Sequence, residues 1–298
     1  MTNNTEVKLI EIEQEMPGFN SFFGSWVCKG DLNILIDTGP ANSVYNLLDS
    51  LMVFEFKRID YICLSHIHID HCGGLAKIID HYPMAKVICH QKGIKHLVNP
   101  SDLWKGSLDV LGEIAVNYGK PEPVAIDVLL PHTENHIDDL NIVETPGHAI
   151  HHLSFSYKGN LFAGEAGGNF FVIKDTEYMR PATPPKFFFD VCIKSVDRLL
   201  SLEDQPIYYV HCGKAKSSHA LLKRFRNQLF LWKDIIKSQL YGSESDITKR
   251  CLSALINQDP NLKAFNMMDS DTKNRERFFL KNSIKGFVGF LKNSLKCD

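Results

Sequence analysis

The chain lacks the features that mark exported or membrane-spanning proteins. It has no basic N-terminal region followed by an apolar run, and no stretch reaches the roughly 18 consecutive apolar residues of a membrane span. Its eight cysteines include no C-x-x-C pair, and this scatter is typical of reduced thiols rather than of a disulfide framework. We therefore expect a soluble, cytoplasmic protein with no membrane partner.

Low-complexity tracts and solenoid repeats are also missing, but charge is unevenly distributed. The net charge is −2, yet residues 214–298 hold 17 Lys and Arg against 8 Asp and Glu. This segment therefore carries +9, which leaves −11 for residues 1–213. The asymmetry predicts two parts with different roles, 1–213 and 214–298.

Strand and helix signals alternate through the first part. Ile59–Leu64 is a short apolar strand, and Gly74–Tyr82 has helical spacing and ends before Pro83. Two similar strand-then-helix halves favour an α/β protein with stacked sheets and helices outside. The other strands are expected at 7–13, 85–89, 141–144 and 207–210, the hairpins in SFFGSWVCKGDLNILIDTG and LSFSYKGNLFAG, and the other helices at 43–52, 93–118 and 188–202.

Strand signals disappear beyond His211. Apolar residues recur there at spacings of three and four, which predicts at least two amphipathic helices, with a shorter helix around Ile247–Ile256 between them. Their stripes are Leu221, Phe225, Leu229, Trp232, Ile236 and Leu240, and Leu280, Ile284, Phe287, Leu291 and Leu295.

One short segment concentrates metal-ligating side chains. Residues 63–75 read CLSHIHIDHCGGL, which places His66, His68, Asp70 and His71 within six residues. Alternate residues of an extended segment face one way, and neutral imidazoles that converge there favour a cation. The segment follows an apolar strand and precedes a helix, a position where ligand sites collect in layered α/β folds. It therefore predicts a metal site.

Three further ligand-type residues each end a strand. His148 follows the Pro-Gly turn of TPGH, Glu165 stands among small residues in FAGEAGG, and His211 closes the strand YYVH. Each signal is weak by itself. Their common position at strand ends makes them candidates for the same site.

The succession HxHxDH, TPGH, strand-end acid and strand-end histidine, spread over about 150 residues, resembles the metallo-β-lactamase superfamily. The resemblance covers roughly residues 7–213. It implies a four-layer αββα sandwich of two mixed sheets with helices outside. Residues 1–213 would form the catalytic domain, and residues 214–298 an α-helical extension packed on or near the active-site mouth, as in glyoxalase II-like relatives.

The resemblance also implies a ligand set for two metal ions. His66, His68 and His148 would hold one ion, while Asp70, His71 and His211 would hold the other. Glu165 would bridge them, and Asp37 in ILIDTG would support the motif loop. Most dinuclear members have aspartate at the bridging position, so Glu165 bears on the metal identity and on whether both sites fill.

Such a centre predicts a hydrolase. Two divalent ions lower the pKa of a bridging water enough to supply hydroxide near neutral pH, and Asp70 is the candidate catalytic residue beside it. Zinc suits the imidazole and carboxylate donors, and iron or manganese is also compatible. We expect hydrolysis of an ester, thioester or lactone. The alternatives are a phosphodiesterase, a mononuclear iron persulfide dioxygenase, and a non-catalytic metal-containing binding or regulatory protein.

The substrate is less well defined by the sequence. Phenylalanines in loops could line an apolar pocket with Arg180 or Lys186 meeting an anionic end, or could anchor the loops to the core. They are Phe19, Phe22, Phe23, Phe170, Phe171 and the three of RPATPPKFFF. The basic helices could cap the site or form a homodimer contact, attract an anionic small-molecule substrate or, least favoured, bind nucleic acid.

The remaining histidines attract simpler interpretations. His151 and His152 are expected at the surface or behind the ligands. No partner pattern accompanies His81, His90, His96, His132, His136 or His219, and no role is predicted for them.

Overall fold

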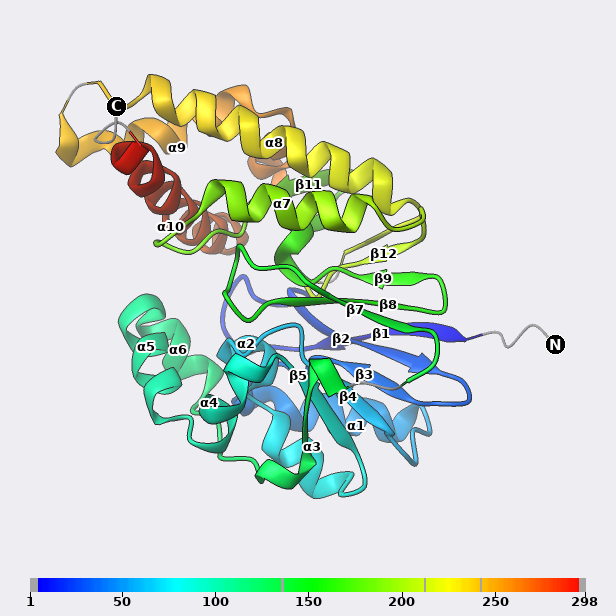
Figure 1. The fold of residues 1–298 in the computed structure, drawn as a ribbon. Helices are drawn as coiled ribbons and strands as arrows, with labels where there is room; N and C mark the ends of the chain where they lie inside the picture. The colour runs from blue at the N-terminus through cyan, green and yellow to red at the C-terminus, as the bar shows by residue number, and fades with distance from the viewer. Residues whose placement is uncertain (1–4, 135–136, 212, 242, 295–298) are drawn as a thin grey trace. The chain divides into compact units, whose positions relative to one another are not determined.

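The computed structural model describes residues 5–134, 137–211, 213–241 and 243–294. The chain divides into two compact units (Figure 1). The first unit contains residues 1–144, 151–162 and 210–212, and the second contains residues 145–150, 163–209 and 213–298. This division differs from the boundary expected at residue 213, because residues 163–209 group with the C-terminal helices. A separate domain at 214–298 stays a prediction.

A six-stranded mixed sheet forms the centre of the first unit. The order is β1-β2-β3-β4-β5-β6, with β1 to β3 antiparallel and β3 to β6 parallel. Parallel neighbours end at one edge of the sheet, so the segments that follow them meet there. The strands are β1 (Glu6–Ile12), β2 (Phe23–Lys29), β3 (Ile34–Ile36), β4 (Tyr61–Cys63), β5 (Lys86–Cys89) and β6 (Leu129–Pro131).

Helices connect these strands. The helix α1 (Val44–Val53) buries Leu47, Leu48 and Leu51 at helical spacing, as its sequence predicts. The irregular stretch expected at 93–118 is helical as three pieces. The other helices are α2 (Ile69–Cys72), α3 (Leu75–His81), α4 (Ile94–Val98), α5 (Ser101–Leu111) and α6 (Glu113–Tyr118), with short 3₁₀ turns η1 (Ala41–Ser43), η2 (Gln91–Gly93), η3 (Ile126–Val128) and η4 (His132–Glu134).

The first unit also contains the strands β7 (Leu140–Glu144), β8 (Leu153–Tyr157) and β9 (Asn160–Phe162). Their pairing is antiparallel, with Glu144 opposite Leu153 and Phe155 opposite Phe162. The β8–β9 turn contains Lys158 and Gly159, both at positive φ, so the hairpin expected from LSFSYKGNLFAG is confirmed. The longer connection between β7 and β8, residues 145–152, carries the TPGH motif.

The second unit contains a hairpin that the sequence did not reveal. Strands β10 (Asn169–Ile173) and β11 (Thr176–Arg180) pair antiparallel around Lys174 and Asp175, both at positive φ. A two-residue turn of this kind usually contains glycine or asparagine, so Lys-Asp gave no turn signal. The helix expected at 188–202 is α7 (Phe189–Leu200). The remaining elements up to the C-terminal helices are η5 (Gly164–Gly167), β12 (Ile207–Tyr208) and β13 (Lys214–Ala215).

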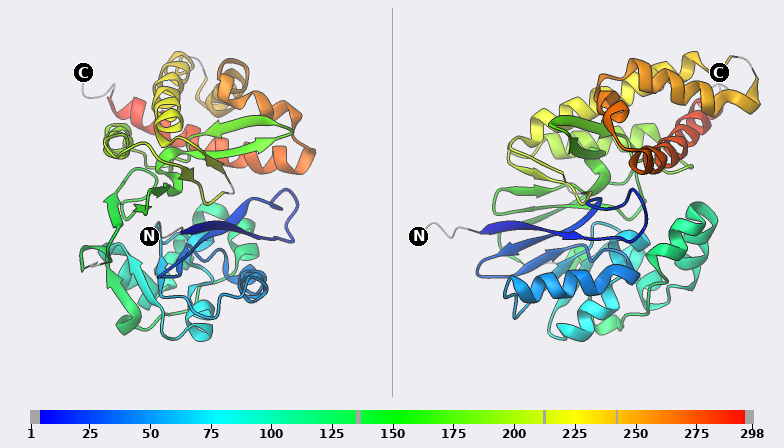
Figure 2. Two further views of the ribbon diagram at one scale, coloured as in Figure 1. Left: turned by 90° about the vertical axis from the view of Figure 1, so that its right-hand side faces the viewer. Right: turned by 180° about the vertical axis from the view of Figure 1, so that it is seen from behind.

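The C-terminal helices pack around an apolar core that also contains buried polar side chains. Figure 2 shows α8 (Ser218–Ser238) in yellow and α10 (Ser270–Ser294) in red, and α10 contacts both α8 and α9 (Ile247–Gln258). The Trp232 indole donates to Asp259 at 2.7 Å. The connections include η6 (Glu244–Asp246) and η7 (Pro260–Met267). Among the described residues, no helix has the length and apolar character needed to span a membrane.

The fold class predicted from the sequence is therefore confirmed. The chain is an α/β protein with a mixed sheet, and its C-terminal region is helical. The two expected stripes lie on α8 and α10, except that Leu240 follows the end of α8 and Leu295 lies outside the described residues. The shorter helix expected between them is α9, and α10 begins at Ser270, well before Leu280.

Candidate metal centre

The motif loop is held by a buried aspartate. Asp37 directly follows β3, and its N–H donates to the Cys63 carbonyl at the end of β4 (3.0 Å). Its carboxylate accepts from the Ser65 N–H and the Ser65 hydroxyl, both at 2.7 Å. The backbone of Asp37 has a φ of 57°, a conformation that aspartate tolerates better than most residues. These contacts match the supporting role expected for Asp37.

The change from strand to helix explains the spacing of the ligand-type residues. His66 and His68 lie on the extended segment after β4, and α2 then turns Asp70 and His71 toward the same region. The first turn closes with the His71 N–H donating to the His68 carbonyl at 2.9 Å. Gly73 ends this turn where space is short, because a Cβ there would lie 2.3 Å from the Ile69 carbonyl oxygen and 2.6 Å from the Ala41 nitrogen.

Three residues of one expected metal site meet within the first unit. Donor atoms of Asp70, His71 and His211 all lie within 4.8 Å of one another. His71 and His211 are buried, whereas Asp70 is partly exposed. Separate parts of the chain, the α2 turn and the segment after β12, therefore supply one cluster, as expected from the strand-end positions.

Hydrogen bonds set the orientation of the two imidazoles in this cluster. His71 Nδ1 lies 3.0 Å from Asp37 Oδ2, and His211 Nδ1 lies 3.2 Å from the Phe22 carbonyl oxygen. Carboxylate and carbonyl oxygens can only accept, so each Nδ1 carries the proton and Nε2 is the nitrogen suited to a metal. The His211 ring also stacks on Phe22, with centroids 4.3 Å apart. These residues fit a divalent ion.

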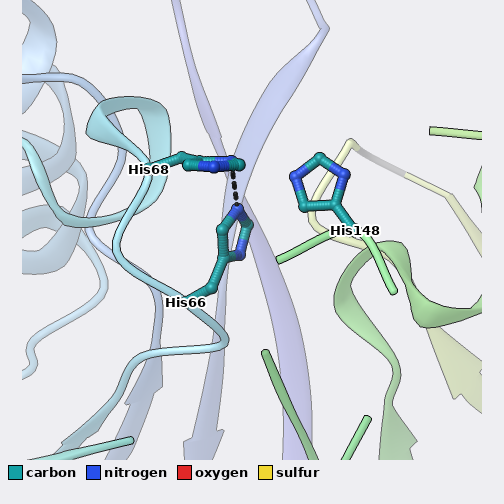
Figure 3. Close-up of side chains that lie close together, drawn as sticks. All are labelled: His66, His68 and His148. Atoms are coloured by element: carbon teal, nitrogen blue, oxygen red, sulfur yellow. Dashed lines mark hydrogen bonds between the residues drawn. The ribbon is translucent and has the colours of Figure 1, made fainter. Parts of the chain in front are cut away.

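The other motif histidines lie in contact. His66 Nε2 and His68 Nδ1 are 2.9 Å apart, as the dashed line in Figure 3 marks, and His66 is buried. The Ser65 hydroxyl lies 3.0 Å from His66 Nδ1 and thereby connects this ring to Asp37. Two ring nitrogens at this separation can share one proton or ligate one cation.

His148 and Glu165 belong to the second unit. His148, also drawn in Figure 3, donates from Nδ1 to the Ala182 carbonyl at 2.6 Å. As in His71 and His211, this leaves the lone pair of Nε2 available to a metal ion. Glu165 is buried in η5. That His148 joins His66 and His68, and that Glu165 bridges two ions, stay predictions.

Two neighbouring histidines lie deeper than a surface position. His152 is fully buried, and its ring centroid is 5.2 Å from that of His66. The His151 ring lies 6.2 Å from His66 and 6.0 Å from His68. Both histidines therefore lie behind or beside the motif, which was one of the two positions expected for them.

The thiol of Cys72 is buried and hydrogen-bonded to the backbone. Its thiol donates to the Ile67 carbonyl at 3.3 Å, and burial, together with the charges of Asp70 and Asp37, raises its pKa above the ordinary value. In the absence of a metal ion, a thiol of raised pKa stays protonated near neutral pH. Cys212, the other cysteine beside a candidate ligand, lies outside the described residues.

The suggested anion-binding role of Arg180 is wrong. Arg180 is 2% exposed and donates from Nε to Glu276, which also accepts from Arg275. Lys186 remains exposed. Most of the loop phenylalanines are buried and anchor their loops, as the second interpretation held, and Phe188 is the exposed exception.

One cluster was missed by the sequence analysis. Donor atoms of His90, His132 and Glu144 lie within 4.8 Å of one another. His90 follows β5, His132 follows β6, and Glu144 ends β7, so the same strand-end criterion that found the metal motif could have found them. They were not found because the three residues lie far apart in the sequence and form no short motif.

Comparisons with known proteins identify the family of the chain. Residues 25–213 match the model of the "Metallo-beta-lactamase superfamily". The chain is 31% identical over 198 residues to the "Metallo-beta-lactamase fold-containing protein ST1585" of Sulfurisphaera tokodaii, an alignment that covers 63% of this chain and 71% of that protein. It is 29% identical over 132 residues to "Hydroxyacylglutathione hydrolase 1" of Vibrio vulnificus, and covers 42% of that enzyme.

The solved structures show the same fold. The crystal structure of ST1585, described as an archaeal metallo-beta-lactamase superfamily protein, superposes with a TM-score of 0.69 at 23% identity and covers 96% of this chain and 99% of that one. The family match spans more than half of the chain and includes the motif loop and His211. The chain therefore belongs to the metallo-beta-lactamase superfamily.

Proposed function

We propose that this protein is a dinuclear metal-dependent hydrolase that acts on an ester, thioester or lactone. The observation that carries the proposal is the convergence of Asp70, His71 and His211. In both imidazoles Nδ1 donates a hydrogen bond, which leaves the lone pair of Nε2 for a metal ion. In hydrolases of this kind, two bound divalent ions activate water and polarise the scissile carbonyl. Zinc is the ion that we propose, because imidazole and carboxylate are among its usual ligands.

The protein's own residues have distinct parts in this chemistry. His66, His68 and His148 would hold one ion, and Asp70, His71 and His211 the other, with Glu165 between them. Asp37 keeps the proton of His71 on Nδ1 and thereby keeps Nε2 available. Asp70 is the partly exposed member of its cluster, so it can both hold an ion and accept a proton from the reacting water.

Similarity supports the choice of bond. The Vibrio vulnificus relative is named as a hydrolase of hydroxyacylglutathione, and an acylated glutathione is a thioester. The chain spans less than half of that relative, so the likeness supports a thioester without identifying the acyl group or the thiol. A small molecule with an apolar part remains the substrate class that we propose.

The test compares the wild type with Asp70→Asn and His71→Ala on one ester, one thioester, one lactone and one phosphodiester. Each protein is loaded with zinc, manganese or iron(II), and elemental analysis gives the ions per chain. We expect carbonyl substrates to be cleaved by the wild type, with a loss of at least about 100-fold in both variants. A wild type as inactive as its variants with every metal would support the non-catalytic binding protein instead.

The same panel separates the alternative enzymes. Cleavage of the phosphodiester alone would favour a phosphodiesterase, for which the +9 charge of residues 214–298 is the supporting observation. Oxygen consumption with glutathione persulfide and one iron per chain would favour a dioxygenase. Two ions per chain together with thioester cleavage would support the proposal and would show that Glu165 is compatible with a filled pair.

A further inference from the structure

A histidine pair and a carboxylate meet where three strands end. His90 directly follows β5 and His132 directly follows β6, and these neighbouring parallel strands pair Cys89 with Pro131. The two rings stack with centroids 4.6 Å apart. Glu144, the last residue of β7, lies with Oε1 3.0 Å from His132 Nε2 and Oε2 4.0 Å from His90 Nε2. All three residues belong to the first unit.

The hydrogen bonds around these rings assign their protons. The Lys92 N–H donates to His90 Nδ1 at 3.0 Å, so the neutral His90 ring carries its proton on Nε2, toward Glu144. His132 Nδ1 is buried and finds no hydrogen-bond partner in the described part of the chain. A proton there would be a buried unpaired donor, so the His132 proton lies on Nε2 and is donated to Glu144.

This arrangement is the reverse of the one at the metal-ligand histidines. His71, His211 and His148 each present Nδ1 to an acceptor and keep Nε2 for a metal. At His90, a metal on Nε2 would require a proton on Nδ1. That Nδ1–H group would point at the Lys92 N–H, and two donors cannot form a hydrogen bond with each other. The cluster is therefore arranged for a hydrogen bond from His132 and a longer polar contact from His90 to one carboxylate, rather than for a bound cation.

Glu144 stands at one end of the loop that carries His148. Residues 145–152 join β7 to β8, and Glu144 pairs with Leu153 across the two strands. At the other end, the Leu153 N–H donates at 2.7 Å to the carbonyl of Ser65, the neighbour of His66. Both ends of the loop are thus attached at the carboxyl ends of the parallel strands: at β4 through Ser65, and at β5 and β6 through His90 and His132.

We propose that His90, His132 and Glu144 form a positioning clamp for the loop 145–152, and that this clamp holds His148 ready to ligate a metal ion. The inference rests on the ligand role of His148 in the proposed function. Attaching both ends restricts the loop before a metal ion binds. The loop then loses less conformational entropy on binding, and the affinity for the metal is higher. Glu144 acts through the loop and is therefore a positioning residue rather than a catalytic one.

The test removes the carboxylate and measures metal affinity. Glu144→Ala deletes the clamp, Glu144→Gln keeps an amide oxygen that can accept from His132 Nε2, and Glu122→Ala is the matched control. Glu122 is likewise an exposed carboxylate that contacts a basic side chain, Lys77 at 3.0 Å, and it lies outside the loop 145–152. Competition with a chelator gives the affinity for zinc, and the visible spectrum of the cobalt(II) form reports the ligand geometry.

We expect Glu144→Ala to bind one of two ions about 10-fold more weakly, the lower end of what is lost when a ligand's support is removed. Its cobalt spectrum should change. Glu144→Gln should recover part of the affinity, and Glu122→Ala should match the wild type. Wild-type affinity and an unchanged spectrum in Glu144→Ala would overturn the clamp.

A metal at the cluster is the competing outcome. A third ion per chain that disappears in His132→Gln would show that the three residues are ligands, and would also overturn the clamp. Because Glu144 is half exposed, its variants keep the test decisive even where a change at buried His132 prevents folding. Metal affinity is read without substrate, so a wild type that binds two ions but cleaves nothing defeats the proposed function and leaves the clamp to be judged by its own measurement.

Discussion

Asp37 Oδ2 and His71 Nδ1 lie 3.0 Å apart, with no more than 1% of either side chain exposed. The same carboxylate accepts both hydrogen bonds of Ser65 and so couples the motif loop to a ligand imidazole. One buried aspartate at the end of β3 therefore sets both the path of the loop and the tautomer of His71.

Replacing Asp37 by asparagine should separate these two effects. The amide oxygen can still accept one hydrogen bond, but its NH₂ group cannot accept the His71 proton. We expect a 10- to 100-fold loss of metal affinity or activity, the usual result of removing such support. Chelator competition measures it. Asp60→Asn is the control, because Asp60 accepts from a backbone N–H at 2.8 Å far from the metal motif.

Gly73→Ala should disturb the motif loop through sterics alone. The added Cβ would meet the Ile69 carbonyl and the Ala41 nitrogen, and backbone atoms cannot move aside as a flexible side chain can. We expect a loss of about 1–3 kcal/mol in the free energy of unfolding, together with weaker metal binding. Urea denaturation measures the first effect and chelator competition the second.

The control for this glycine is Gly106 within α5, where a Cβ would meet no atom within 4 Å. Alanine should stabilise the helix by up to about 1 kcal/mol, because it has the higher helix propensity. Equal behaviour of the two alanine variants would contradict the steric account of Gly73.

Removal of metal should lower the stability of the whole chain. A ligand that binds only the folded state stabilises it by about 2.7 kcal/mol at a concentration 100 times its Kd. Thermal unfolding should therefore shift to lower temperature after chelation and return after zinc is added. In His71→Ala and His211→Ala the shift should be smaller. An unfolding temperature of the wild type that does not change on chelation would contradict a metal site in the folded protein.

The buried Arg180–Glu276 pair should dominate the stability of the second unit at acid pH. Burial favours a neutral Glu276, but the charges of Arg180 and Arg275 outweigh burial and hold its pKa below the ordinary value of 4.5. A carboxyl with a lowered folded-state pKa stabilises the protein above its unfolded-state pKa, and this contribution is lost as the pH falls through the folded-state pKa. Stability measured by denaturant should therefore begin to fall below about pH 5.

Glu276→Gln should remove that pH dependence. Two buried guanidinium groups would then lack their carboxylate, and the loss should be about 3–5 kcal/mol at neutral pH. The variant's stability should change less than that of the wild type between pH 5 and pH 3. A parallel decline of both proteins would show that other carboxylates cause the acid sensitivity.

The sequence predicted most of the architecture because local patterns encode it. Apolar runs, glycine turns and helical stripes identified β4, β5, the β8–β9 hairpin and the C-terminal helices. The hairpin β10–β11 was missed because Lys174 and Asp175 occupy positive-φ positions without the usual turn residues. Backbone conformations held by tertiary contacts leave no such local signature.

The ligand candidates could be selected from the sequence because metal chemistry restricts residue types, and because strand-end motifs in this order resemble one superfamily. The sequence alone shows that Asp70, His71 and His211 have side chains suited to a metal site. Their convergence and the Nδ1 contacts of His71 and His211 depend on residues far apart in the chain. The same holds for the pairing of Arg180 with Glu276 and for the contact of His132 with Glu144. Periodicity determined which residues face the core, but only the tertiary structure decided which atoms each polar group meets, because hydrogen bonds and ion pairs depend on positions in space.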